Sequence, residues 1–298
     1  MGNGNARREL LGAGRVVLEI GGRPGPGKLR FEIAGEGRLK VLRQGTRPVL
    51  LGRLTGDGCC HDLALHRLDG YRSPIPPLTS QEMRSAGNRP HSYARRLEEA
   101  EESPLYDGRW QISTRTWFAP GIWSEDLVTG WPGGSLELYC GGGWHGVLPL
   151  RRLSPPGAPR VKAYRKHARE GTLAPVLLWW VPFLDGWLIL DGHDRAVAAL
   201  AEGGTPPCLV LTRLSDVEAW REEAETMTEG HRHLMERLAA RPATSSTDRQ
   251  RAAVDEAYGN AVADVAYEPS YLPSWPLPGG DPAWDALAKA AMFQFPGD

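Results

Sequence analysis

A dense group of ionisable side chains occupies residues 191–195, where the sequence reads Asp-Gly-His-Asp-Arg. The apolar run from Trp187 to Leu190 comes before it and an alanine-rich segment follows, so the group falls between a predicted strand and a predicted helix. The N-terminus of a helix presents unpaired N–H groups and a partial positive charge, and it binds phosphate well. A mere turn would need only the Asp and the Gly. The additional ionisable residues therefore indicate a site for an anion.

Each residue of this loop suits a part of phosphate chemistry. Gly192 lets the backbone approach a ligand closely, and the planar guanidinium of Arg195 suits phosphate oxygens. His193 can donate a hydrogen bond or move a proton, and Asp191 can hold Mg²⁺ or accept a proton from a hydroxyl. We therefore predict Asp191 and His193 as catalytic residues and Asp191 as a metal ligand. Gly192, His193, Asp194 and Arg195 are predicted to bind a nucleotide.

A purely structural interpretation of the same loop stays open. In it, Asp191 caps the helix, while His193 and Arg195 are surface residues. The two interpretations differ most at Arg195. If the loop holds phosphate, we expect Arg195 to be exposed on the first helical turn and to face the ligand, with Val197 and Leu200 facing the core.

Basic residues collect upstream of the loop. Residues 1–213 contain 28 basic and 21 acidic side chains, whereas residues 214–298 contain 7 basic and 15 acidic ones. Seven basic residues and no acidic one lie within residues 151–169, a pattern that suits phosphate or nucleic acid, or a solvated helix face. We expect Arg165 or Lys166 to add positive charge beside a bound nucleotide.

The elements that must position these residues divide the chain into three regions. Residues 147–214 read as alternating strands and short helices, including a hairpin with an Asp-Gly turn. Residues 1–146 are predicted to be mainly β and rich in tryptophan, which suggests an acceptor pocket of their own. Residues 215–298 are predicted to be a helical, acidic extension. The expected fold class is α+β.

Residues 147–214 resemble the ParB/sulfiredoxin superfamily. The matching stretches are VLPLRRL, RVKAYRKHAREG, PVLLWW, GWLILDGHDRAVAALAEG and PCLVL. The Asp-Gly-His-x-Arg pattern at residues 191–195 resembles the signature loop of that superfamily. The resemblance implies a ParB/sulfiredoxin-like α/β domain that holds nucleotide phosphates at the helix N-terminus. Members bind CTP and DNA, use ATP to repair an oxidised cysteine, or phosphorylate free serine.

The chain departs from each of these activities. His193 stands where sulfiredoxin chemistry needs a cysteine. Arg151 and Arg152 follow the first strand, where the serine kinases have a catalytic glutamate. No helix-turn-helix is evident after residue 214. From the loop at residues 191–195 and the separate tryptophan-rich region, we expect a nucleoside triphosphate or diphosphate with Mg²⁺, used to transfer phosphate to a small hydroxyl compound. The alternative is a non-catalytic ParB-like module that binds DNA or nucleotide.

A glycine-rich segment near the N-terminus imitates a phosphate-binding loop. Gly22, Gly27 and Lys28 have most of the required spacing, but Leu29 stands where Ser or Thr would bind Mg²⁺. A phosphate-cradling loop must lead into a helix, whereas residues 29–33 alternate as a strand does. We therefore predict a connection between strands there.

The C-terminal third begins with a long predicted helix. Apolar residues recur in a heptad pattern over residues 217–238, which favours packing on the chain's own domain and leaves oligomerisation open. Ser215 and Glu218 predict a capping box at its start. A second helix is predicted near residues 247–264, followed by a tail rich in Pro and Trp.

Composition limits the class of protein. Hydrophobic residues are 41% of the 298 residues and charged residues 24%, which is typical of a soluble globular chain. No apolar run approaches the roughly 20 residues that span a bilayer, and the N-terminus lacks the apolar core of a signal peptide. We expect a cytoplasmic protein with no membrane partner.

Overall fold

The computed structural model describes residues 6–11, 14–55, 62–85, 87–119, 121–123, 135–138 and 146–292. The chain forms two compact units. Unit 1 contains residues 1–212 and 272–298, and unit 2 contains residues 213–271. Helices and mixed β-sheets both occur, so the predicted α+β class is confirmed.

The first sheet of unit 1 carries the loop at residues 191–195. Its strand order is β1-β2-β7-β12-β10-β11-β9. The strands are β1 (Ala6–Leu11), β2 (Arg15–Ile20), β7 (Gly108–Arg115), β9 (Val147–Pro149), β10 (Val176–Val181), β11 (Gly186–Asp191) and β12 (Cys208–Arg213). β10 and β11 form the predicted antiparallel hairpin, while β12 runs parallel to β10 and β9 runs parallel to β11. The sheet is therefore mixed.

The second sheet has the order β13-β3-β4-β5-β6-β8. Its strands are β3 (Leu29–Ala34), β4 (Leu39–Gln44), β5 (Arg47–Thr55), β6 (Asp62–Arg67), β8 (Ser135–Leu138) and β13 (Trp275–Pro276). β3 to β6 form an antiparallel meander, and β13 adds a parallel edge strand to β3. Short 3₁₀ turns occur at η1 (Gly35–Gly37) and η2 (Pro182–Leu184).

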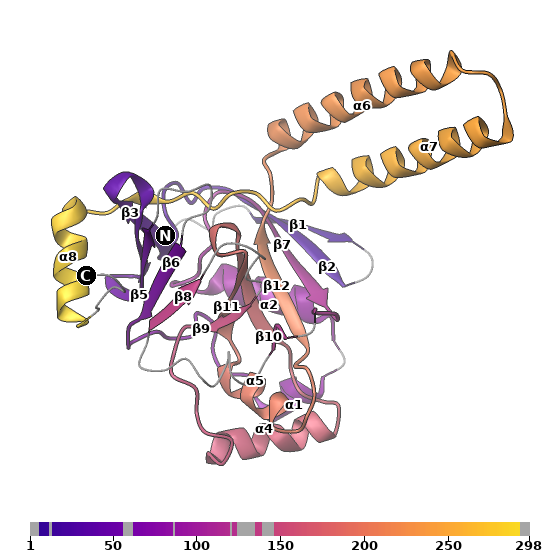
Figure 1. Cartoon of the computed structure of the whole chain (residues 1–298). Coiled ribbons are helices and arrows are strands. Elements are labelled where there is room, and N and C mark those ends of the chain that lie inside the picture. Colours follow the sequence, from indigo (N-terminus) through magenta and orange to yellow (C-terminus); the bar gives the residue numbers. More distant parts are fainter. Residues whose placement is uncertain are drawn as a thin grey trace. The chain divides into compact units, whose positions relative to one another are not determined.

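Helices of unit 1 flank these sheets (Figure 1). They are α1 (Ser80–Arg84), α2 (Arg89–Glu99), α4 (Pro159–Arg169), α5 (His193–Leu200) and α8 (Gly280–Ala290). α4 and α5 pack against each other, and α8 packs on β3 and β4. α1 begins with a capping box, in which Thr79 and Glu82 each bond the other's backbone N–H.

One hydrophobic core contains side chains both from the N-terminal elements of unit 1 and from residues 147–212. One cluster contains buried side chains from α2 and from the strands β2, β7, β10, β11 and β12, among them Leu18, Tyr93, Trp110, Leu177 and Leu188. Burial of each such side chain stabilises the fold by roughly 1.5–3 kcal/mol. Residues 147–212 thus share a sheet with β1, β2 and β7 and a core with α2, β2 and β7. The boundary predicted at residue 146 does not separate two compact units.

The segment that imitates a phosphate-binding loop leads into β3, so the predicted connection between strands is confirmed. A Cβ atom at Gly27 would lie 2.8 Å from the carbonyl oxygen of Pro104. Close packing against the backbone of Pro104 therefore explains why residue 27 is a glycine, and no bound phosphate is needed to explain it.

Unit 2 is built around a helical hairpin of α6 (Val217–Ala239) and α7 (Ser245–Val265). The ring of His231 stacks on Tyr258 with centroids 4.1 Å apart, and its Nε2 lies 2.8 Å from Asp255 Oδ1. The heptad face of α6 thus contacts α7. The predicted capping box is wrong, because Asp216 is the N-cap residue and its carboxylate accepts a bond from Arg213 instead.

The tail after residue 266 is more ordered than its composition predicts, since it contains β13 and α8. Among the described residues, no helix is both long enough and apolar enough to cross a bilayer.

Candidate functional site

The strand, loop and helix predicted around residues 187–200 are present. β11 ends at Asp191, Gly192 adopts a left-handed conformation with φ of 95°, and α5 begins at His193. The first backbone bond of α5 runs from the N–H of Ala196 to the carbonyl of Gly192 (2.8 Å). The N–H groups of residues 193–195 therefore precede the helical ladder, as expected at a helix start.

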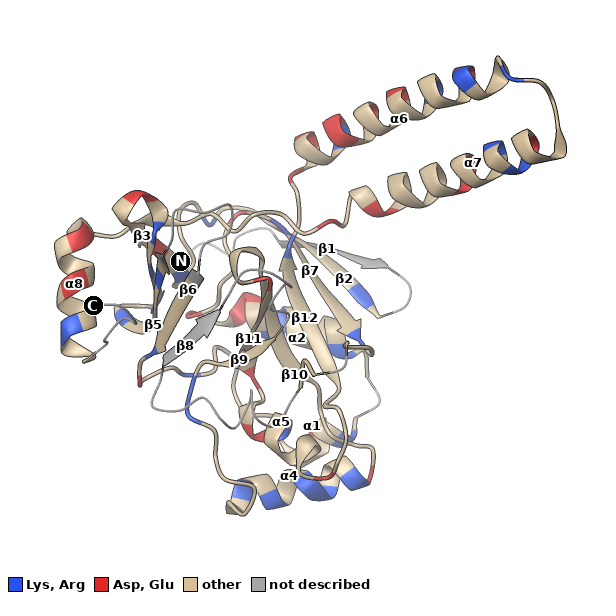
Figure 2. Ribbon diagram, viewed as in Figure 1, with Lys and Arg blue, Asp and Glu red and all other residues tan. Residues whose placement is uncertain are grey.

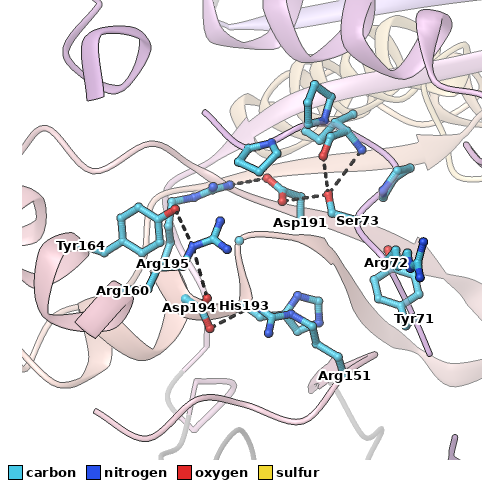
Figure 3. A pocket seen from close by; sticks show the side chains of 15 residues that line it. Tyr71, Arg72, Ser73, Arg151, Arg160, Tyr164, Asp191, His193, Asp194 and Arg195 are labelled. Carbon is cyan, nitrogen blue, oxygen red and sulfur yellow. Dashed lines mark hydrogen bonds and ion pairs between the residues drawn. The ribbon is translucent and has the colours of Figure 1, made fainter. Parts of the chain in front are cut away.

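A cavity of about 400 Å³ lies at this helix N-terminus. Its lining comes from segments far apart in the sequence: residues 71–77, Arg151, Arg160, Tyr164 and residues 191–195. Figure 3 shows these side chains converging from opposite sides of the cavity. The five residues of the predicted loop therefore do line a cavity.

Arg195 and Asp191 form a buried ion pair at this site. Arg195 Nη2 lies 2.6 Å from Asp191 Oδ2 and also donates to the carbonyl of Pro175 at 2.9 Å. Only 3% of Arg195 is exposed, so the expectation of an exposed Arg195 is wrong. Burial opposes the charged guanidinium, but the Asp191 carboxylate, together with the nearby Tyr93 and Tyr164, offsets this effect and raises the Arg195 pKa above its ordinary value. Of the two residues expected to face the core, Val197 is buried and Leu200 is half-buried.

Gly192 has a packing reason to be glycine. A Cβ atom there would lie 2.8 Å from Nη2 of Arg195, and the φ of 95° disfavours any side chain. The close approach predicted for a ligand is therefore made by the guanidinium of the chain itself.

The other oxygen of Asp191 faces a loop from the N-terminal half. The hydroxyl of Ser73 lies 2.9 Å from Asp191 Oδ1, and the hydroxyl of Tyr71 donates to the carbonyl of Leu190 at 2.8 Å. Burial, with the Asp191 charge nearby, raises the Tyr71 pKa well above 10.0. These bonds fix residues 71–77 beside the end of β11.

His193 is buried and uncharged. Desolvation, with the charges of Arg151 and Arg67, lowers the His193 pKa well below 6.5. Its Nε2 lies 3.1 Å from the backbone N–H of Leu150 and accepts a bond from it. The ring proton therefore resides on Nδ1. His193 can offer a neutral donor to a ligand, but not the positive charge of an imidazolium.

Asp194 contacts two of the arginines that line the cavity, Arg151 and Arg160. Its Oδ1 lies 3.0 Å from Arg151 Nη2 and accepts a bond from Ser154 at 2.9 Å, while its Oδ2 lies 3.6 Å from Arg160 Nε. Only 4% of Asp194 is exposed. Asp194 thus holds two arginines and does not itself offer a donor to phosphate.

Arg165 and Lys166 lie outside this cavity. Arg165 pairs with Glu202, and Lys166 lies 3.8 Å from Glu170. Arg160 and Tyr164 line the cavity instead, one helical turn apart on another face of α4. The helix was predicted correctly, but the face that meets the cavity was not.

These ion pairs lower the net positive charge presented by the basic side chains of α4, which Figure 2 shows in blue. Arg165 and Arg169 share Glu202, and Arg160 points towards Asp194. Much of the charge that suggested nucleic acid is therefore balanced by acidic side chains of the chain itself.

The cavity is nevertheless cationic. Four arginines and two aspartates line it, which gives a formal charge of +2. Arg72 is exposed, and its guanidinium makes no hydrogen bond or ion pair with the residues that the structure describes. The Nε of Arg195 is buried and, among those residues, likewise has no hydrogen-bond partner. The exposed guanidinium of Arg72 is thus available to an anionic ligand in this cavity.

The sequence alone did not identify the loop at residues 71–77 as part of the site. Its proline-rich composition marked it only as a loop. The tryptophans expected to shape a pocket lie elsewhere: Trp110 is in the core, Trp117 is exposed, and neither lines this cavity. Trp131 and Trp144 lie outside the described residues.

Within the described ranges, no group of three or more His, Cys, Asp or Glu side chains is arranged to hold a metal ion. Each oxygen of Asp191 accepts one hydrogen bond, Oδ1 from the hydroxyl of Ser73 and Oδ2 from Arg195, and the role of Asp191 as a metal ligand stays a prediction.

Comparisons with protein-family models, with curated proteins and with solved structures find no match to this chain.

Proposed function

We propose that this chain binds a nucleoside triphosphate or diphosphate in the cavity at the N-terminus of α5 and transfers a phosphoryl group to a hydroxyl. The observation that carries the proposal is the cationic lining beside a carboxylate that already contacts a hydroxyl. Phosphoryl transfer depends on positioning and on stabilising charge, and these residues supply both.

The roles follow from the contacts. Arg72, Arg151 and Arg160 would neutralise phosphate oxygens, with the N–H groups of residues 193–195 as further donors. The neutral His193 would donate through Nδ1. Asp191 would accept the proton of the attacking hydroxyl, held in place by Arg195.

The resemblance to the ParB/sulfiredoxin superfamily supports the same proposal. The order β9-α4-β10-β11-α5-β12, with a hairpin before the Asp-Gly-His-x-Arg loop, agrees with the elements on which that resemblance depends. We include a ParB/sulfiredoxin-like fold for residues 147–214 in the proposal.

Mg²⁺ would accompany the phosphates of the nucleotide, because it usually binds through one or two carboxylates together with substrate phosphates, and the carboxylates that line the cavity are those of Asp191 and Asp194. It would neutralise phosphate charge. The residues of the chain would meanwhile orient the phosphates and take up the proton.

Isothermal titration with ATP, ADP and CTP, each with and without Mg²⁺, tests the proposal. We expect at least one nucleotide to bind at micromolar to millimolar concentration. Absence of binding by all three at millimolar concentration would overturn it. Binding that weakens steeply with salt for DNA but is absent for nucleotides would favour the DNA-binding alternative instead.

A further inference from the structure

The geometry points to Ser73 as the first acceptor of the phosphoryl group, which makes residue 73 a site of self-phosphorylation. This inference rests on the proposed nucleotide binding and adds the identity of the attacking hydroxyl. Ser73 lines the cavity, is exposed, and lies 2.9 Å from Asp191 Oδ1.

The hydroxyl of Ser73 is oriented for attack. Its oxygen accepts a bond from the N–H of Ile75 at 3.3 Å, which occupies one of its two lone pairs. Its proton has two acceptors at 2.9 Å, Asp191 Oδ1 and the carbonyl of Ile75. Donation to Asp191 leaves the second lone pair available for phosphorus.

The base is held by a third group, as activated nucleophiles require. Asp191 Oδ2 is bonded to Arg195, so Oδ1 is the oxygen that faces Ser73. Arg195 is fixed in turn by the carbonyl of Pro175 at 2.9 Å and lies 3.4 Å from the hydroxyl of Tyr93. A serine, a carboxylate and a buried arginine thus form one connected chain of contacts.

The loop that carries Ser73 is restrained. The hydroxyl of Tyr71 bonds the carbonyl of Leu190, and Pro74, Pro76 and Pro77 limit the backbone on the other side. The hydroxyl therefore has a defined position next to Arg72 and in the same cavity as Arg151.

The transfer balances without any further reactant. Ser73 Oγ forms a bond to the terminal phosphorus of a nucleoside triphosphate, and the bond from that phosphorus to the bridging oxygen breaks. The Ser73 proton moves to Asp191 Oδ1, and the nucleoside diphosphate leaves with the electron pair of the broken bond. No group is oxidised or reduced.

The chain contains an internal comparison for this assignment. Ser154 also donates to a carboxylate at 2.9 Å, that of Asp194, but Arg151 and Arg160 contact the same carboxylate, and Ser154 does not line the cavity. If a hydrogen bond to an aspartate were sufficient, both Ser73 and Ser154 would be phosphorylated. If the serine must also line the cavity, only Ser73 would be.

The experiment incubates the full chain with Mg²⁺ and ATP, or with CTP, and follows the intact mass and the modified residue by mass spectrometry. We expect the addition of one phosphoryl group, found at Ser73 and not at Ser154. Ser73→Ala should abolish it, and Ser73→Thr should retain it at residue 73. Asp191→Asn should slow it by about a hundredfold or more, the usual contribution of a general base.

Nucleotide binding is measured by titration on the same samples. Binding without any phosphoryl group at residue 73 would overturn the assignment of Ser73 and leave the proposed function standing. Phosphate at Ser154, or equal modification of the Ser73→Ala variant, would also overturn it. Absence of both binding and modification would overturn the two proposals together.

Discussion

Arg195 and Asp191, four residues apart, bond to each other across the junction between β11 and α5, with Nη2 2.6 Å from Oδ2. Both residues are buried, so neither charged group is well solvated by bulk water. A buried ion pair that loses one partner leaves an uncompensated charge, which is strongly destabilising. The pair is thus a structural requirement of the loop as well as a support for its carboxylate.

Arg195→Ala should lower the free energy of unfolding by about 3–5 kcal/mol, because it leaves the Asp191 carboxylate buried without its cation. Urea denaturation measures the loss. Arg165→Ala is the matched control, since it removes a partly exposed pair with Glu202 and should cost about 1 kcal/mol or less. Equal, small losses for both variants would contradict the structural role of Arg195.

Gly192→Ala should destabilise the protein more than Gly203→Ala does. Both glycines have positive φ, of 95° and 74°, so both variants acquire backbone strain of about 1–3 kcal/mol. Only the Cβ at residue 192 meets a neighbour, Nη2 of Arg195 at 2.8 Å, whereas nothing lies within 4 Å of a Cβ at residue 203. Thermal denaturation of the two variants isolates this contact; identical melting temperatures would argue against it.

Arg160→Ala should weaken nucleotide binding while leaving stability nearly unchanged. A charge-assisted hydrogen bond contributes about 1.5–3 kcal/mol, which corresponds to roughly a tenfold to hundredfold change in affinity. Lys162→Ala removes a cation from the same helix outside the cavity and serves as the control. If both variants bind nucleotide equally well in calorimetry, α4 contributes only general positive charge, or none.

Acidification should destabilise the fold through His193. The His193 pKa is well below 6.5 in the folded protein, so the unfolded chain takes up a proton first as the pH falls. The neutral His193 therefore costs the folded protein no stability above pH 6.5. Below pH 6.5, the free energy of unfolding falls by up to about 1.4 kcal/mol per pH unit. Urea denaturation between pH 7.5 and pH 5 measures this slope.

His193→Gln should flatten that slope, whereas His233→Gln, at an exposed position on α6, should leave it unchanged. A slope that survives the His193 substitution would show that another group, such as the buried His66, is responsible; burial lowers the pKa of His66 as well.

The local part of the site could be predicted from the sequence, because it depends on neighbours in the chain. The apolar run to Leu190, the glycine at residue 192 and the helix after it are a continuous pattern. The buried pair of Asp191 and Arg195 was not predicted, because Asp191 belongs to β11 and Arg195 to α5, and the spacing rule for ion pairs applies to residues on one exposed helix face.

The remaining part depends on contacts across long stretches of sequence. Ser73 and Asp191 are 118 residues apart, and no periodicity shows that their loops meet. The choice between Arg160 and Arg165 depends on how α4 is rotated against α5, which the pattern of α4 alone does not determine. By contrast, α8 did leave a local signal in the spacing of Trp284, Leu287, Ala288 and Ala291, hidden by the prolines before it.

The two ends of the α6–α7 hairpin are tied to each other within unit 2. The N–H of Ser270 donates to the carbonyl of Arg213 at 2.8 Å, and Leu214 and Pro269 form an isolated β-bridge. The polypeptide thus leaves unit 1 and comes back to it through adjacent positions, as a cassette inserted into a host domain does. A gene could lose or exchange that cassette for a short connector and still encode the strand and helix that follow it.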